Sequence, residues 1–171
     1  WRGTSRSARC SCPATNRRKD AYGGDLDGRA RLPLEVVRRV REVVGAGYPI
    51  LCKLNLRDGF RGGLEVPDAV GVAQRLEREG VDALVLSGGF TSKTPFYLFR
   101  GRRPLKEMIE VEKSRFQKLA LAWFGRSVIR EYPFEEMFFL PEAREMRRAV
   151  RMPLVLLGGI VSRENVDRAM T

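Results

Sequence analysis

The sequence predicts an α/β fold whose parallel strands form part of a barrel. Amphipathic helical segments alternate with short, almost wholly apolar runs, which is the pattern of repeated βαβ units with a sheet covered on both faces. No G-x-G-x-x-G turn follows the first strand, as would be expected of a dinucleotide-binding doubly wound sheet. The absence of that turn favours a barrel over an open sheet.

Each element follows from a local pattern. Val36, Val37 and Val40 recur at helical spacing with arginines on the opposite face, and Ser162 is a suitable N-cap for the last helix. Tyr48-Pro49 and the paired glycines delimit strands from helices. The expected helices are 34–44, 68–79, 105–124, 142–150 and 163–170, the expected strands are 50–55, 81–87 and 152–159, and 90–103 is expected to be a loop.

The composition is that of a globular protein. The chain has 171 residues, of which 43% are hydrophobic, enough for a buried core. No run of about 18 apolar residues occurs, so we expect no membrane partner and a soluble, cytoplasmic protein. Residues 13–171 are expected to form one barrel domain, and the polar residues 1–12 to be a disordered segment outside it.

The net charge of +11 raises the alternative of a basic nucleic-acid-binding protein. Its distribution argues against that alternative, because most arginines alternate with acidic residues, as on solvated helix faces. The densest basic cluster lies within residues 2–19. We therefore expect no nucleic-acid partner and keep nucleic-acid binding as the weaker alternative.

Metal and histidine chemistry are not expected. Cys10, Cys12 and Cys52 match neither a disulfide framework nor a metal site, and the sequence has no histidine. Acid–base catalysis by histidine is thereby excluded within this chain, and no catalytic residue can be assigned.

A barrel carries its active site at the carboxyl ends of its strands, so the last residues of each apolar run are the candidate site. The polar or backbone-exposing residues there are Lys53, Ser87, Gly88, Gly158 and Gly159. Strand alternation places Lys53 with Leu51 and Asn55, on the face toward the lumen. A lysine extending outward from a strand end, and glycines that merely end strands, are the plainer alternatives.

A long motif gives these positions a context. Residues 12–31 read C-P-A-T-N-R-R-K-D-A-Y-G-G-D-L-D-G-R-A-R and resemble the S-P-x-T-N-x-R-x-D-x-Y-G-G-S-x-x-x-R-x-R signature of the NADH:flavin oxidoreductase, or Old Yellow Enzyme, family. Cys12 and Asp25 replace its two serines. Further similar segments, in the family's order, are K-L-N at 53–55, G-G-L at 62–64, V-L-S-G-G at 85–89 and P-L-V-L-L-G-G-I at 153–160.

The resemblance implies an FMN-dependent (β/α)8 TIM barrel, of which this chain supplies roughly strands 5 to 7 with their helices. It implies a flavoprotein that transfers hydride from NADH or NADPH through the flavin to a small-molecule electron acceptor, as an ene-reductase does with an electron-poor alkene. Lys53 would lie beside the flavin pyrimidine and Gly158 and Gly159 at the FMN phosphate, with Ser87 and Gly88 near the same mouth. An oligomer is compatible with this assignment.

Two family features are missing from the sequence, the histidine pair after the fourth strand and the Gly-Arg after the eighth. We therefore expect this chain to be incomplete, and alone to show neither stable flavin absorbance nor NADH oxidation. A truncated or degenerate barrel fragment without catalytic activity is the alternative.

Two other segments carry expectations. Asn16, Arg17, Asp20, Tyr22 and Arg29 are expected to form a hydrogen-bonded loop scaffold, in which Tyr22 is not a proton donor. The aromatic segment before the third strand is expected either to cover the substrate mouth or to be an ordinary packing insert. Its members are Trp123, Phe124, Phe134, Phe138 and Phe139.

Overall fold

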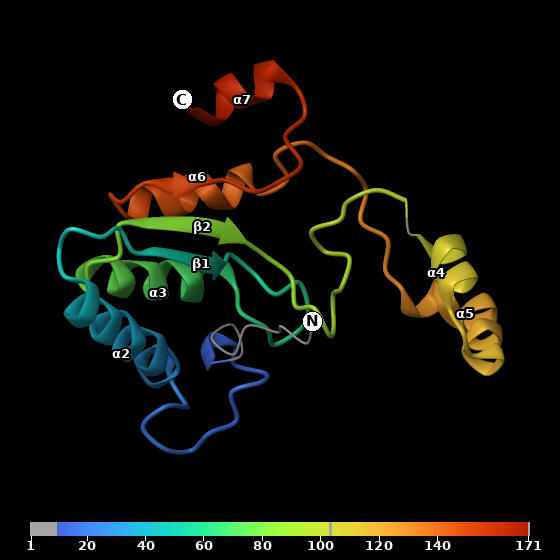
Figure 1. The fold of residues 1–171 in the computed structure, drawn as a ribbon, viewed down its shortest axis with the longest axis horizontal. Helices are drawn as coiled ribbons and strands as arrows, with labels where there is room; N and C mark the ends of the chain where they lie inside the picture. Colours follow the sequence, from blue (N-terminus) through green and yellow to red (C-terminus); the bar gives the residue numbers. More distant parts are fainter. Residues whose placement is uncertain (1–9, 103, 171) are drawn as a thin grey trace.

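The computed structural model describes residues 10–102 and 104–170 and confirms the alternation of helices and parallel strands (Figure 1). The expectation for residues 1–12 falls mainly on residues 1–9, which lie outside the described ranges. Ser11 and Cys12 are buried. The elements are α2 (Leu26–Val44), β1 (Leu51–Asn55), α3 (Val66–Arg78), β2 (Ala83–Ser87), α4 (Leu105–Val111), α5 (Arg115–Val128), α6 (Leu140–Ala149), β3 (Leu154–Val155) and α7 (Arg163–Met170).

The three strands are parallel neighbours in chain order, β1-β2-β3. Lys53 pairs with Val85, and Val85 with Val155, so one row of side chains crosses the sheet. Sequential order without reversal is the arrangement of barrel strands, whereas a doubly wound sheet changes direction at its switch point. The prediction that these strands are adjacent and parallel is confirmed.

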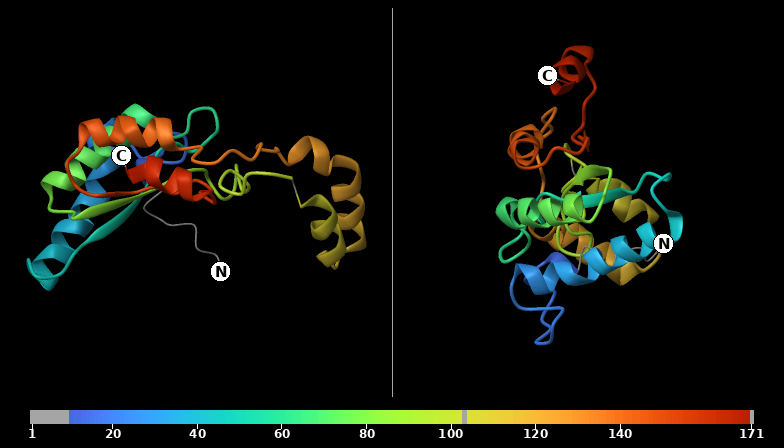
Figure 2. Two further views of the ribbon diagram at one scale, coloured as in Figure 1. Left: turned by 90° about the horizontal axis from the view of Figure 1, so that it is seen from above. Right: turned by 90° about the vertical axis from the view of Figure 1, so that its left-hand side faces the viewer.

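Helices α2, α3 and α6 lie side by side on one face of the sheet (Figure 2). Leu54, Leu84 and Leu86 of the strands are buried beneath them. The opposite face is open, with Leu51 57% and Val155 43% exposed. The expectation of a sheet covered on both faces is therefore wrong for the described residues. Right-handed crossovers between sequential strands bring each helix back to the same face.

Helix α2 begins at Leu26 rather than at residue 34. Its N-cap is Asp25, whose Oδ1 accepts a hydrogen bond of 2.9 Å from the N–H of Gly28. Pro33 lies inside the helix. The cap and the packing of buried Ala30 and Val37 outweigh the hydrogen bond that a proline cannot donate.

The helix expected over 105–124 is two helices, α4 and α5. Glu112 Oε1 accepts hydrogen bonds from the N–H groups of Lys113 and Ser114, and Ser114 then caps α5 through the N–H of Gln117. These local side-chain bonds compete with the helical ladder and divide it. The third strand is also shorter than the expected 152–159, because only Leu154 and Val155 pair with β2.

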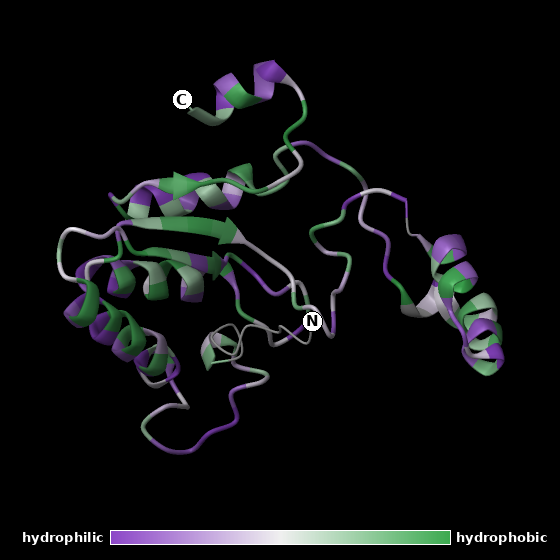
Figure 3. Cartoon of the chain, viewed as in Figure 1, coloured by the Kyte–Doolittle hydropathy of each residue, from purple (hydrophilic) through white to green (hydrophobic). Residues whose placement is uncertain are grey.

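Helices α4 and α5 form an arm that projects away from the sheet (Figures 1 and 3). Trp123 and Phe124 lie on this arm and are 77% and 62% exposed, whereas Phe139 is 1% exposed and packs in the core. The aromatic segment is therefore not one unit. The packing interpretation is confirmed for Phe138 and Phe139, and the mouth-covering interpretation stays a prediction for the others.

Several arginines of the helical layer pair with acidic residues. Arg38 pairs with Glu79 and Arg41 with Asp82, and both pairs join α2 to the α3–β2 connection. These pairs confirm the interpretation of the basic segments as solvated helix faces. Within residues 10–102 and 104–170, no helix combines the length and apolarity needed to cross a bilayer.

The difference between the two faces can be tested with two leucines. Leu86→Ala should lower the free energy of unfolding by about 2–5 kcal/mol, because Leu86 is fully buried against the helices. Leu51→Ala, on the open face, should change it by only about 0.5 kcal/mol. Urea unfolding monitored by circular dichroism measures both. Equal losses would contradict the assignment of the faces.

Candidate functional site

Backbone hydrogen bonds join β1 and β2 beyond their last residues. The N–H of Leu56 donates to the carbonyl of Ser87 at 2.7 Å, and that of Gly89 to the carbonyl of Arg57 at 2.8 Å. The Asn55 side-chain amide donates to the carbonyl of Gly89 at 2.8 Å. The structure thus brings the segment 87–89 to the carboxyl end of β1, and it buries Ser87.

Glycine is required at Gly88 and Gly89. A Cβ on Gly88 would lie 2.3 Å from Cζ of Phe139, and Gly89 has a φ of +80°. The close approach of Phe139 therefore explains Gly88, and the positive φ explains Gly89. The interpretation of this segment as a strand terminator is confirmed, and its proximity to a ligand stays a prediction.

Lys53 lies on the open face of the sheet, as strand alternation predicts. It follows Leu51 on that face and is exposed, and in register it lies beside Val85. The part of the chain that the structure describes offers no ion pair or hydrogen bond to its ammonium group. Lys53 is thus an unpaired cation on the side of the sheet opposite to the helices.

Gly158 and Gly159 follow β3 in a turn. The carbonyl of Gly158 accepts a 2.8 Å hydrogen bond from the N–H of Met137, and Gly159 has a φ of +63°. Among the described residues, no acceptor bonds to the N–H groups of Gly159 and Ile160. Main-chain donors without acceptors suit an anionic ligand.

The next residues of this turn are held by Glu136. Its Oε2 accepts four hydrogen bonds: from the N–H of Val161 (3.1 Å), the N–H of Ser162 (3.1 Å), the hydroxyl of Ser162 (3.0 Å) and the side-chain amide of Asn165 (2.9 Å). Ser162 also caps α7 through the N–H of Asn165, as predicted. We call Glu136, Met137 and the turn 158–162 the Glu136 clasp.

Met137 in the clasp has a φ of +56°, and no other non-glycine residue of the described ranges has a positive φ. A left-handed conformation costs energy for a residue with a side chain, and such strain concentrates at functional sites. No sequence signal identified Met137 or Glu136, because both depend on hydrogen bonds to a turn more than twenty residues further along the chain.

A second carboxylate, which is buried, lies after β1. Asp58 is 1% exposed, its Oδ2 accepts from the N–H of Leu64 at 2.8 Å, and its Oδ1 accepts from the Asn55 amide at 3.1 Å. Burial first, and then Asp58 itself, raise the pKa of the nearby Cys12 thiol. The glycines at 62–63 allow the chain to close around this carboxylate. This pair of glycines was the sequence signal that could have identified Asp58.

The signature loop is a scaffold, as predicted. The Asn16 side-chain amide donates to the carbonyls of Cys10 and Tyr22 at 2.7 Å each. Buried Arg29 donates to the carbonyl of Ser11 and pairs with Asp68 at 2.6 Å, which ties the loop to α3. Arg17 makes a local bond of 3.4 Å to the carbonyl of Ala14, and Asp20 pairs with Arg18.

Tyr22 is not prepared for proton donation. Its hydroxyl donates to Glu35 Oε2 at 3.0 Å, and this hydrogen bond raises its pKa. A raised pKa makes the hydroxyl a weaker acid, which agrees with the predicted structural role.

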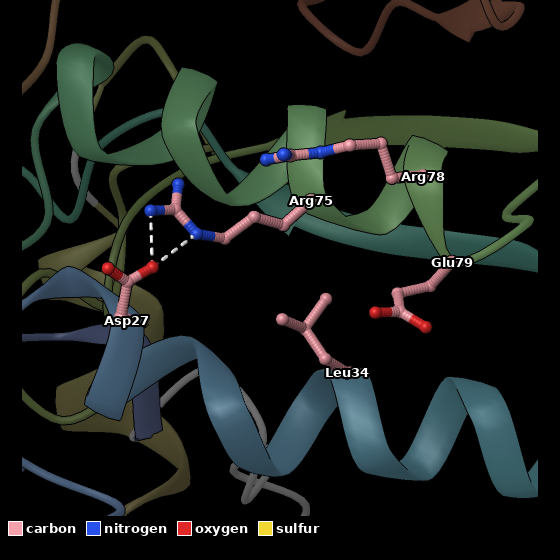
Figure 4. A pocket seen from close by; sticks show the side chains of 5 residues that line it. All are labelled: Asp27, Leu34, Arg75, Arg78 and Glu79. Atoms are coloured by element: carbon pink, nitrogen blue, oxygen red, sulfur yellow. Dashed lines mark hydrogen bonds and ion pairs between the residues drawn. The ribbon is translucent and has the colours of Figure 1, made fainter.

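A surface hollow between α2 and α3 does not belong to this site (Figure 4). It is lined by Asp27, Leu34, Arg75, Arg78 and Glu79. Arg75 is bonded to Asp27, and Glu79 to Arg38, so these charges are satisfied within the protein. The hollow lies in the helical layer, whereas Lys53 is on the opposite face of the sheet.

The described residues contain no group of three or more side chains suited to a metal ion, and no disulfide links the described cysteines. The candidate site therefore consists of Lys53, main-chain N–H groups and two carboxylates that organise turns.

Residues 10–90 match the model of the NADH:flavin oxidoreductase / NADH oxidase family. The 4,4'-dithiodibutanoate disulfide reductase of Rhodococcus erythropolis is 39% identical over 159 residues, which are 92% of this chain and 39% of that protein. The NADH oxidase of Thermoanaerobacter brockii is 31% identical over 91% of this chain and 19% of its own length. The chain belongs to the NADH:flavin oxidoreductase / NADH oxidase family, and it spans at most about two fifths of these relatives.

Solved structures show the same fold. Histamine dehydrogenase from Rhizobium sp. 4-9 matches 96% of this chain with a TM-score of 0.66, at 19% identity and over 19% of that chain. A 2-naphthoyl-CoA reductase complex matches 81% of this chain with a TM-score of 0.52, at 21% identity and over 24% of that chain. The three-stranded parallel sheet with its helices is thus a segment of a known larger α/β fold.

One electrostatic prediction follows from the Glu136 clasp. Hydrogen bonds, first from Asn165 and then from the N–H groups of Val161 and Ser162, lower the pKa of Glu136 from 4.5 to about 2. Because the folded pKa lies below the ordinary value, the stabilisation is complete above pH 4.5 and is lost as the pH falls toward 2. We expect the amide NMR signals of Val161 and Ser162 to titrate in that window.

Glu136→Gln is the control for this titration, since a glutamine does not ionise. Its Val161 and Ser162 signals should stay constant between pH 4.5 and 2. An identical titration in the variant would assign the effect to another group.

Proposed function

We propose that this chain forms part of the FMN site of an NAD(P)H oxidoreductase that reduces a small-molecule electron acceptor. The carrying observation is the pair of N–H groups at Gly159 and Ile160, which have no acceptor among the described residues. They lie in the turn after β3, two strands away from Lys53, whose ammonium group has no described partner. The family match supports a flavin, and a phosphate ester fits donors that have no acceptor among residues 10–102 and 104–170.

We assign a role to each sequence-predicted residue on this basis. The turn of Gly158 and Gly159 would hold the FMN phosphate, and Lys53 would lie at the pyrimidine, where negative charge develops on reduction. Ser87 and Gly88 would border the same mouth. FMN, when bound, supplies the hydride transfer, and the described residues supply binding and electrostatics.

The finer assignments are proposals of the same kind. The strands β1, β2 and β3 would be roughly the fifth to seventh of an eight-stranded barrel, with NADH or NADPH as the reductant. We propose an electron-poor alkene as the acceptor, as for ene-reductases. The relative named as a disulfide reductase makes a disulfide the competing acceptor class. Turnover of one class and not the other, by the protein that contains this chain, decides between them.

Flavin retention provides the first test. The chain purified alone should keep no flavin absorbance after gel filtration with added FMN, and should oxidise neither NADH nor NADPH, because Lys53 and the amide turn at 158–160 are too few contacts for a large cofactor. Absorbance spectra and nicotinamide fluorescence measure this. A yellow, stoichiometrically loaded sample would refute the prediction and favour a self-sufficient site over an inactive fragment.

Weak binding provides the second test. Lys53→Met should weaken FMN binding to the chain about tenfold, because it removes a charged hydrogen-bond donor. FMN fluorescence quenching at millimolar protein measures the affinity. Lys106→Met is the matched control, since Lys106 is exposed on the arm. Equal affinities of the wild-type chain and the Lys53 variant would remove Lys53 from the site.

A further inference from the structure

The turn after β3 contains four consecutive N–H groups, and Glu136 divides them into two pairs. The N–H groups of Val161 and Ser162 donate to Glu136 Oε2, whereas those of Gly159 and Ile160 donate to no described acceptor. The Glu136 carboxylate accepts hydrogen bonds from two of the four N–H groups and thereby fixes the conformation of the turn. The other two N–H groups remain available to a ligand.

We infer that Glu136 is a positioning residue for the phosphate end of the flavin site, an inference that rests on the proposed function. Glu136 does not touch the phosphate. It holds Val161, Ser162 and Asn165 at 2.9–3.1 Å, so that Gly159 and Ile160 present their N–H groups in one fixed arrangement. Groups held in place before binding lose less entropy when the ligand arrives.

The backbone beside Glu136 supports this role. Met137 keeps a left-handed φ of +56°, and its N–H donates to the carbonyl of Gly158 at 2.8 Å. The segment 136–137 therefore makes hydrogen bonds to the turn on both sides of Gly159. Strain at a non-glycine residue persists only where surrounding contacts enforce it, and the hydrogen bonds of the clasp are those contacts.

Removing the charge of Glu136 distinguishes the positioning role from a direct electrostatic effect of the carboxylate on the phosphate. A carboxylate acting directly on a phosphate would repel it, so Glu136→Gln would tighten phosphate binding. A positioning carboxylate behaves differently. Glutamine can offer one oxygen to the same four donors through weaker neutral bonds, and alanine can offer none. Positioning therefore predicts that affinity falls from glutamate to glutamine to alanine.

The experiment uses the isotope-labelled chain at millimolar FMN, with riboflavin and inorganic phosphate as comparison ligands. In the wild-type chain, FMN and phosphate should shift the amide signals of Gly159 and Ile160, and riboflavin, which lacks the phosphate, should not. Glu136→Ala should weaken FMN binding about tenfold and speed hydrogen exchange at Val161 and Ser162 by a similar factor. Glu136→Gln should fall between the two.

Glu135→Gln is the matched control. Glu135 is the neighbour of Glu136, its side chain is exposed, and its substitution removes the same charge, so this variant should behave as wild type. Unchanged amide signals of β2 in each variant verify folding. Wild-type FMN affinity in Glu136→Ala, or tighter binding in Glu136→Gln, would overturn the positioning role alone. Failure of FMN to shift Gly159 and Ile160 in the wild-type chain would overturn the phosphate assignment of the turn, and the positioning role with it.

Discussion

The parallel pairing of β1, β2 and β3 is the constraint on which the rest of the structure depends. Because the strands run the same way in sequential order, their carboxyl ends meet at one edge, and every returning helix lies on one face. The opposite face is left with Lys53 and the exposed Leu51 and Val155. Segments more than a hundred residues apart in the sequence are thereby parts of one sheet.

Two carboxylates organise the turns at that edge. Asp58 bonds to the main chain at Leu64 and closes the turn after β1, and Glu136 bonds to Val161 and Ser162 and closes the turn after β3. In both turns, charge-assisted bonds to N–H groups replace the strand ladder where it ends. The edge is consequently built from fixed turns, which is what a site that positions a large planar cofactor requires.

The signature loop and the arm contribute in different ways. Buried Arg29 fastens the loop to α3 through Asp68, so this long motif is mainly structural within the described residues. The arm of α4 and α5 projects from the edge of the sheet where the strands end (Figure 1), and Glu136 and Met137 belong to the connection from α5 to α6. The geometry of the turn after β3 therefore depends on a segment that leads in from the arm.

The sequence by itself determined the fold class, the parallel strands, the loop scaffold and the face on which Lys53 lies, because these follow from local periodicity and from strand alternation. It did not determine the start of α2, since a cap at Asp25 and tertiary packing overrode Pro33. The glycines at 62–63 were a signal for Asp58, but nothing in the sequence placed Glu136 or the strained Met137 in the site. Their roles exist only through hydrogen bonds to distant turns, and those partners come together only when the strands pair.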